Sequence, residues 1–352
     1  MLDLDSLCSA VVAAYLRSSA SAQNLHIPLS NLPREDLKLR TEMSLVLKHA
    51  GLEFSDLLTL SELPELSLED ANWFLVDHNA LTGPLKKFQP RVNACIDHHV
   101  DDGVTSKDAK PRVIEHCGSC MSLIVDEYRK DWEASSRTGD AGELDSRLAK
   151  LSLAPILIDT INLTAKEKMA EKDTTSTKFL IPLIKDKDFD PTKFHDDINA
   201  VKEDISSLTF RDIFRKDYKQ WEDSGITLGI SCVVQNFDYL LEKAKSKGVF
   251  LDELSAWAKE RALDVTAVMT TSHPDGDFQR HLLVWATTEK GESSVRQFIQ
   301  SATDVLQLKQ WQDGSLDGHA RFAWQQSKLA ASRKQVAPLL REAIDSSGKE
   351  RL

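Results

Sequence analysis

Three short apolar runs in the first half of the chain each end on an aspartate. Residues 73–76 precede Asp77, residues 92–96 precede Asp97, and residues 155–158 precede Asp159. A short run rich in Val, Ile and aromatic residues, followed by helix-like sequence, is typical of a buried parallel strand. Ligands of open α/β sheets bind beyond the carboxyl ends of the strands, so the three aspartates are expected at one edge of a parallel sheet.

Histidines follow two of these aspartates, namely His78 after Asp77 and His98 and His99 after Asp97. One aspartate after a strand can simply form a turn. Three such endings, two of them with histidines, instead predict a site for divalent cations, which prefer carboxylate and imidazole ligands.

Two further carboxylates, Asp3 and Asp5, stand at the start of the first apolar helix pattern. Alternate residues of an extended segment point to opposite sides, so these two aspartates could serve two adjacent ions. One of them could instead cap the helix. Taken alone, the pattern favours capping. Taken with the other aspartates, it strengthens the prediction of a metal site.

The bulk properties limit the class of protein. The chain has 352 residues, enough for two domains with their own cores, and a net charge of −11, which argues against non-specific nucleic-acid binding. It has no apolar run of the ~18 residues that span a bilayer and no basic segment of the signal-peptide type at Met1. We therefore expect a cytoplasmic protein that binds neither nucleic acid nor membrane. We also expect a monomer, although these properties do not determine the oligomeric state.

The five cysteines fit a reducing compartment. Cys117 and Cys120 have CxxC spacing, but no second pair completes a zinc site, so a helix start is the better interpretation.

The pattern along the chain predicts an α/β protein with two domains. Residues 1–165 form the parallel-sheet domain, the charged residues 166–190 form a linker, and residues 191–352 form a smaller mixed α/β domain. In the second domain we expect strands near 226–234, 263–271 and 281–287, and helices near 194–207, 237–247, 293–306 and 325–346.

Four motifs in order resemble the signature of the DHH phosphoesterase superfamily. They are Asp-Leu-Asp-Ser at 3–6, Asp-His-Asn at 77–79, Asp-His-His at 97–99 and Ile-Asp-Thr at 158–160. The second half resembles the DHHA2 domain, through Asp217-Tyr218-Lys219-Gln220-Trp221, residues 229–234 and Ser332-Arg333-Lys334-Gln335-Val336. The resemblance covers nearly the whole chain and implies an active site in the cleft between the two domains.

The resemblance also implies a role for each matched residue. Two divalent cations, Mn, Co or Mg, would be held by Asp3 at one site and by Asp5, His98 and Asp159 at the other, with Asp77 shared between the two sites. His78 and Asp97 would orient these ligands, and His99 would face the substrate phosphate. Asp77, His98 and His99 would carry the catalysis, and Lys219, Arg333 and Lys334 would bind phosphate.

Within this superfamily the sequence is most similar to eukaryotic cytosolic exopolyphosphatases. The function implied is release of terminal orthophosphate from inorganic polyphosphate through a metal-activated water. Inserts near 19–52 and 130–148 favour this substrate over pyrophosphate, because pyrophosphatases are more compact. A family II pyrophosphatase and a prune-like phosphodiesterase remain alternatives of the same chemistry. A catalytically impaired interaction protein is the alternative of another class.

One departure from the family concerns the N-terminus. The family has a strand before its first motif that ends in Gly-Asn or Gly-His, with the Asn or His four residues before the first aspartate. Four residues before Asp3 fall ahead of Met1. The resemblance therefore implies a missing strand and a missing metal-site neighbour, through an incomplete gene model or a short inactive isoform, and leaves the activity of this exact chain open.

Overall fold

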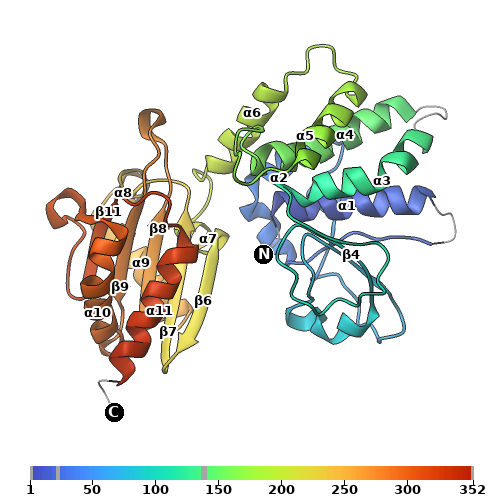
Figure 1. The fold of residues 1–352 in the computed structure, drawn as a ribbon. Helices are drawn as coiled ribbons and strands as arrows, with labels where there is room; N and C mark the ends of the chain where they lie inside the picture. The colour runs from blue at the N-terminus through green and yellow to red at the C-terminus, as the bar shows by residue number, and fades with distance from the viewer. Residues whose placement is uncertain (1–2, 21–23, 136–140, 350–352) are drawn as a thin grey trace. The chain divides into compact units, whose positions relative to one another are not determined.

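The computed structural model describes residues 3–20, 24–135 and 141–349, and it divides the chain into two compact units (Figure 1). Unit 1 spans Met1–Lys202 and unit 2 spans Glu203–Leu352. This division corrects the expected linker at 166–190. Those residues belong to unit 1, where Leu180 is fully buried in the apolar core and Asp173 is fully buried against Gly118 and Ser119.

Unit 1 combines helices with two parallel sheets. Its helices are α1 (Leu4–Ala20), α2 (Thr41–His49), α3 (Cys120–Ser135), α4 (Ala141–Asp159), α5 (Glu171–Leu180) and α6 (Pro191–Glu203). Its 3-10 helices are η1 (Arg34–Leu39), η2 (Phe54–Asp56), η3 (Gly83–Arg91) and η4 (Ile181–Leu183). The main sheet has the order β3-β4-β5, and its strands are β3 (Trp73–Val76), β4 (Val92–Asp97) and β5 (Arg112–Ile114), while β1 (Leu29–Ser30) pairs with β2 (Leu58–Thr59).

Two of the three predicted strands that end on aspartate are present. β3 and β4 are parallel neighbours, and Val76 pairs with Ile96, so the carboxyl ends of both strands lie at one edge of the sheet. The prediction of a parallel sheet in the first half is confirmed.

The third predicted strand is wrong, because residues 155–159 are the last residues of helix α4. Its apolar residues from Leu148 to Leu157 are buried, and α4 packs against α1, α2, α3 and α5. A short apolar run does not distinguish a fully buried strand from a helix buried on all sides. Pro155 removes one backbone donor, at a cost of about 3 kcal/mol, which burial of neighbouring Leu and Ile side chains at about 1.5–3 kcal/mol each offsets.

Unit 2 is built on a six-stranded mixed sheet of order β10-β11-β9-β8-β7-β6. Its strands are β6 (Tyr218–Asp223), β7 (Ile226–Val233), β8 (Val265–Thr270), β9 (His281–Ala286), β10 (Leu308–Gln310) and β11 (Arg321–Gln326). Only β7 and β8 pair in parallel among these described strands. Its helices are α7 (Phe210–Lys216), α8 (Phe237–Ala244), α9 (Lys247–Glu260), α10 (Glu289–Leu306) and α11 (Arg333–Lys349), with η5 (Pro274–Gly276) and η6 (Trp311–Gly314).

Two apolar cores lie on the two faces of this sheet. Phe298 of α10 and Val336 of α11 pack with Ile230 and Val284 in one core, and helices α7, α8 and α9 build the other (Figure 1). The expected strands near 226–234, 263–271 and 281–287 are confirmed, as are the helices near 237–247 and 293–306. The region 325–346 is wrong as a single helix, since residues 321–326 form β11 before α11 begins.

None of the described helices is both long and apolar enough to cross a bilayer. All five cysteines are free thiols, four of them buried.

Candidate metal centre

The Asp77 carboxylate is placed by a left-handed turn directly after β3. Its backbone N–H donates to the carbonyl of Ile96 at 3.0 Å, which continues the ladder between β3 and β4 by one residue. Its φ of 61° lies in the left-handed region, which costs a non-glycine residue about 1–2 kcal/mol. Such strain is retained where the surroundings fix it, and here Ser6 of α1 donates its hydroxyl to Asp77 Oδ2.

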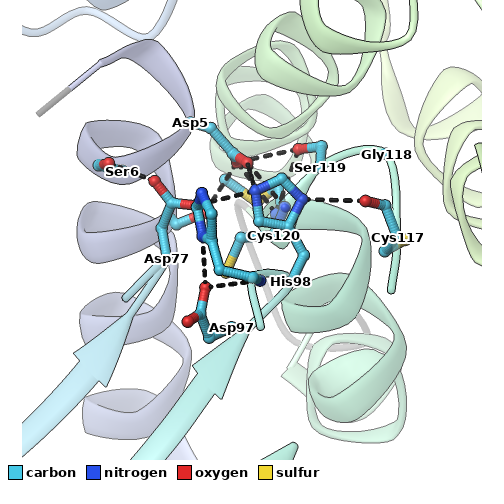
Figure 2. A network of polar contacts seen from close by, with 12 residues as sticks. Asp5, Ser6, Asp77, Asp97, His98, Cys117, Gly118, Ser119 and Cys120 are labelled. Atoms are coloured by element: carbon cyan, nitrogen blue, oxygen red, sulfur yellow. Dashed lines mark hydrogen bonds and ion pairs between the residues drawn. The ribbon is translucent and has the colours of Figure 1, made fainter. Parts of the chain in front are cut away.

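Asp77, His98 and His99 form the closest group of candidate ligands among the described residues. Each offers one ligand atom, and these atoms lie within 4.8 Å of one another. His98 Nε2 lies 3.2 Å from Asp77 Oδ1 and 4.0 Å from Asp5 Oδ2. Figure 2 shows Asp77 and His98 turned toward each other above the strand ends, with Asp5 close to both. The sequence prediction that these residues meet at one sheet edge is confirmed by this geometry.

The side chain of Asp5, a residue of α1, is buried against the N-terminus of helix α3. Its carboxylate accepts hydrogen bonds from the backbone N–H groups of Cys120 at 2.7 Å and Met121 at 3.1 Å, and from the Ser119 hydroxyl at 2.9 Å (Figure 2). Free N–H groups at a helix N-terminus stabilise a carboxylate. Asp5 is thereby held in one orientation although it belongs to the first turn of another helix, α1.

The two histidines of the Asp-His-His motif are oriented by different acceptors. His98 donates from Nδ1 to the carbonyl of Cys117 at 2.9 Å, which turns Nε2 toward Asp77 and Asp5. His99 donates from Nδ1 to Asp97 Oδ1 at 2.8 Å. Asp97 is fully buried and also accepts from Asn79 Nδ2 at 2.6 Å. A hydrogen bond at one ring nitrogen fixes the tautomer and the direction of the other nitrogen. These contacts therefore set the role of each imidazole.

The other predicted ligands of unit 1 lie around this group. Asp3 caps α1, with its Oδ1 accepting from the Ser6 N–H at 3.1 Å. Asp159 ends α4, where its carboxyl interacts electrostatically with Asp5, Asp3 and His98. His78 donates from Nδ1 to the carbonyl of Val76 at 2.8 Å and lies outside the closest group. The predicted roles of all three stay predictions.

The electrostatics of the centre are those of crowded, buried acids. Burial, with the charges of Asp77 and Asp3, raises the pKa of Asp5 to about 7 against the opposing effect of His98. Burial and the neighbours Asp5 and Asp3 hold the pKa of Asp159 well above its usual range. Burial lowers the pKa of His98, but the contacts with Asp77 and Asp5 outweigh it and raise that pKa to about 10. The carboxylates of the centre thus repel one another, and the positive charge of His98 offsets part of this repulsion.

In unit 2 the predicted phosphate-binding residues lie on β6 and in the first turn of α11. Arg333 begins α11, and its guanidinium contacts Asp217 through the carboxylate at 2.8 Å and the backbone carbonyl at 3.1 Å. Lys219 on β6 and Lys334 on α11 are exposed. The Ser332 and Gln335 side chains cap α11, with the Ser332 N–H donating to Gln335 Oε1 at 2.9 Å.

Comparison with known proteins agrees with this arrangement. The family model of the DHHA2 domain matches residues 196–343. A protein of Schizosaccharomyces pombe named "Putative exopolyphosphatase" is 31% identical over 347 residues, which cover 97% of this chain and 88% of that protein. The chain belongs to the DHH phosphoesterase superfamily, in its DHHA2-containing branch. The resemblance drawn from the four motifs is confirmed.

Other relatives of this DHH protein carry two kinds of name. Rat "Exopolyphosphatase PRUNE1" is 26% identical, with 98% of this chain and 74% of that protein covered. The "Manganese-dependent inorganic pyrophosphatase" of Methanothrix thermoacetophila is 25% identical over 275 residues, which cover 76% of this chain and 78% of that protein. The solved structure of a "putative family II inorganic pyrophosphatase" of Methanococcus jannaschii has a TM-score of 0.56 at 21% identity, and the match covers 98% of this chain and 97% of that chain. That likeness confirms the fold.

The residues of this DHH protein fit a divalent cation. Asp77 Oδ1 is buried and accepts no well-aligned hydrogen bond from the described residues; its contacts are ion pairs with His98 Nε2 at 3.2 Å and His99 Nδ1 at 3.8 Å. Buried carboxylate oxygens need a partner, and a cation would supply one. The donor set of carboxylates and imidazoles is suited to Mn, Co or Mg.

Sequence reasoning missed Asp173, which fixes the turn that orients His98. Asp173 is fully buried on α5 and accepts from the backbone N–H groups of Gly118 at 2.9 Å and Ser119 at 3.2 Å. A Cβ on Gly118 would lie 2.6 Å from Thr160 Cγ2, so the end of α4 packs tightly against the same turn. The only sequence signal was an acidic residue in a segment interpreted as a linker.

Proposed function

We propose that this DHH protein is a divalent-metal-dependent phosphohydrolase that releases terminal orthophosphate from inorganic polyphosphate. The observation that carries the proposal is the group of Asp77, His98 and His99, with buried Asp5 beside it, at the carboxyl ends of β3 and β4. The names of relatives that align with nearly the whole chain support phosphoanhydride hydrolysis as the reaction class.

In this proposal Asp77, Asp5 and His98 hold the cations, and Asp3 and Asp159 complete the two predicted sites. When bound, divalent cations polarise a phosphoryl oxygen and activate the attacking water. The chain's own residues prepare the site for them. Cys117 and Asp173 fix the ring of His98 and its supporting turn, and Ser6 with the Asp77 turn fixes the shared carboxylate.

His99 is the proposed contact for the substrate phosphate. Its contact with Asp97 is the largest influence on its charge and raises the pKa of the imidazole above its usual value, despite burial and His98. A ring held in the protonated form can bind a phosphate oxygen or give a proton to the departing phosphate. With 60% of its side chain exposed, His99 is also the most accessible member of the group.

Lys219, Arg333 and Lys334 are the proposed phosphate ligands of unit 2. Arginine matches two phosphate oxygens with two N–H groups, while lysine adds a single charge. The ion pair with Asp217 at 2.8 Å orients the Arg333 guanidinium before substrate binds.

The test is phosphate release by the purified chain from long-chain polyphosphate, tripolyphosphate and pyrophosphate, with Mn, Co, Mg or EDTA present. We expect release from polyphosphate with a divalent cation and none in EDTA. Preference for pyrophosphate would favour the pyrophosphatase alternative, which the name of the Methanothrix relative supports. Release from no phosphoanhydride would favour the non-catalytic interaction protein.

A further inference from the structure

Asn79, the last residue of the Asp-His-Asn motif, is buried in the segment that follows β3. Only 3% of its surface is exposed, although its side chain is polar. The two residues before it, Asp77 and His78, have predicted roles at the metal centre. Buried amides normally have partners for their polar atoms, so the partners of Asn79 show which parts of the site it holds.

The side-chain amide of Asn79 connects the end of β4 with the loop that follows it. Its Nδ2 donates to Asp97 Oδ2 at 2.6 Å and to the carbonyl of Val100 at 3.0 Å, and its Oδ1 accepts from the Asp102 N–H at 2.8 Å. These partners determine which way the amide faces. The Asn79 backbone carbonyl also accepts from the Thr105 hydroxyl at 2.6 Å, so both its main chain and its side chain are held.

Asn79 and His99 bind opposite oxygens of one carboxylate. Asp97 is fully buried, and its Oδ1 accepts from the His99 ring Nδ1 at 2.8 Å and from the His99 backbone N–H at 3.2 Å. Its Oδ2 accepts from Asn79. Because a carboxylate is planar, a donor on one oxygen restricts the direction in which the other oxygen faces. Asn79 therefore limits the rotation of Asp97, and Asp97 in turn directs the His99 ring.

Asn79 also holds the chain on the far side of His99. The loop here is exposed, with 88% of Val100 and 60% of the His99 side chain open to solvent. An exposed ring on a loop keeps its rotational freedom unless its surroundings fix it. The contacts from Asn79 to Val100 and Asp102 fix the backbone within three residues of His99. The ring is thereby ordered before substrate binds, which is what a precise contact requires.

The two sets of contacts require a neutral side chain with both donors and an acceptor. An aspartate at position 79 would direct a carboxylate oxygen at the carboxylate of Asp97, and like charges so close repel each other. An alanine would leave Asp97 Oδ2 and the Asp102 N–H without the partners that they have in the wild type. An amide of this length satisfies both at once.

We propose that Asn79 is a positioning residue that directs His99 toward the substrate phosphate by holding Asp97 and the loop after His99 at the same time. The inference rests on the proposed function and deepens it, because it adds a residue that acts through another side chain and takes no part in the chemistry. All the contacts that carry it lie within unit 1.

A double-mutant cycle tests whether Asn79 acts through His99. Asn79→Ala should lower kcat for polyphosphate about tenfold to hundredfold, with KM changed less than about threefold. In a His99→Ala background, Asn79→Ala should lower kcat less than about twofold further, because the ring that it positions is gone. Asn79→Ser, whose single hydroxyl cannot hold Asp97 and Asp102 at once, should show a loss of the same kind and serves if the alanine variant does not fold. Equal losses in both backgrounds would show that Asn79 acts on the fold in general.

Two control variants separate positioning from stability. Thr105→Val removes the buried hydroxyl contact to the Asn79 backbone but keeps the amide. We expect it to lower the melting temperature while kcat stays within about twofold of the wild type. Asn93→Ala truncates an exposed asparagine on β4 and should match the wild type in both measurements. A loss of kcat in Thr105→Val as large as that in Asn79→Ala would overturn the positioning role.

A measurement on the metal-free chain keeps the test independent of turnover. In EDTA, the NMR signal of the His99 ring Nδ1–H should be visible in the wild type, because Asp97 accepts a hydrogen bond from it. It should broaden or disappear in Asn79→Ala at an unchanged circular dichroism spectrum. An unchanged His99 signal in an active enzyme would overturn the role of Asn79 alone. A wild-type chain that releases no phosphate with any divalent cation would overturn the proposed function, and the role of Asn79 in the reaction with it.

Discussion

Asp5 accepts a hydrogen bond from the backbone N–H of Cys120 at 2.7 Å, which ties the first turn of α1 to the first turn of α3. The helix N-terminus favours the ionised carboxylate, yet burial and the charges of Asp77 and Asp3 raise its pKa to about 7. The fold therefore holds these acids together against their repulsion. A bound cation would relieve that repulsion, which gives the metal centre measurable consequences.

Asp77→Ala should abolish divalent-cation-dependent phosphate release, because the same carboxylate is proposed to serve both ions. Metal binding measured by calorimetry should fall at both sites together. Asp101→Ala, which removes an exposed carboxylate paired to Arg112, is the matched control and should retain turnover. Near-wild-type turnover in Asp77→Ala would refute the shared-ligand role.

Asp97→Asn should lower the pKa of His99, since the contact at 2.8 Å between Asp97 Oδ1 and His99 Nδ1 is the main influence that raises it. NMR titration of the His99 ring measures this directly. We expect kcat to fall more than tenfold with KM less affected, as for a group acting on the departing phosphate. An unchanged His99 titration would show that Asp97 does not control its charge.

Asp173→Asn should lower the free energy of unfolding by about 1–3 kcal/mol, because the amide NH₂ replaces one carboxylate oxygen and leaves the N–H of either Gly118 or Ser119 without its acceptor. Chemical denaturation measures the change. Asp126→Asn on the exposed surface of α3 is the control, since a surface pair contributes about 0–1 kcal/mol. Equal stability of the two variants would remove the structural role given to Asp173.

Arg333→Ala should reduce kcat/KM for polyphosphate at unchanged metal affinity, because its proposed partner is phosphate. Each lost charge-assisted contact is worth about 1.5–3 kcal/mol, or roughly tenfold to hundredfold. Asp217→Asn offers a second readout, since it keeps Arg333 but removes the carboxylate that orients it. If kcat/KM stayed at the wild-type value in Arg333→Ala, the phosphate role would be wrong.

The metal-free protein should lose stability as the pH rises from about 4 to about 7. The folded pKa of Asp5, about 7, lies above its unfolded value of about 3.9. The contribution of Asp5 to the free energy of unfolding is therefore present at low pH and lost through this window. His98, with a folded pKa of about 10, adds a similar loss from about 6.5 upward. Because cation binding requires ionised carboxylates, Mn should raise the melting temperature more at pH 8 than at pH 5. Equal gains at both pH values, measured by thermal unfolding with Mn and with EDTA, would contradict this account.

The sequence by itself predicted the α/β class, the two strands that end near Asp77 and Asp97, the meeting of Asp77 with His98 and His99, and the superfamily. The first three follow from local pattern, because strand composition and the parallel-sheet rule place strand ends together, whereas the superfamily followed from the resemblance of four motifs. Tertiary structure alone decided that residues 155–159 are helical, since burial on every side removes the periodicity that distinguishes helix from strand. It also decided that Asp173 supports the His98 turn, because its partner Gly118 lies 55 residues away along the chain. A contact over such a separation leaves no local pattern, and only packing creates it.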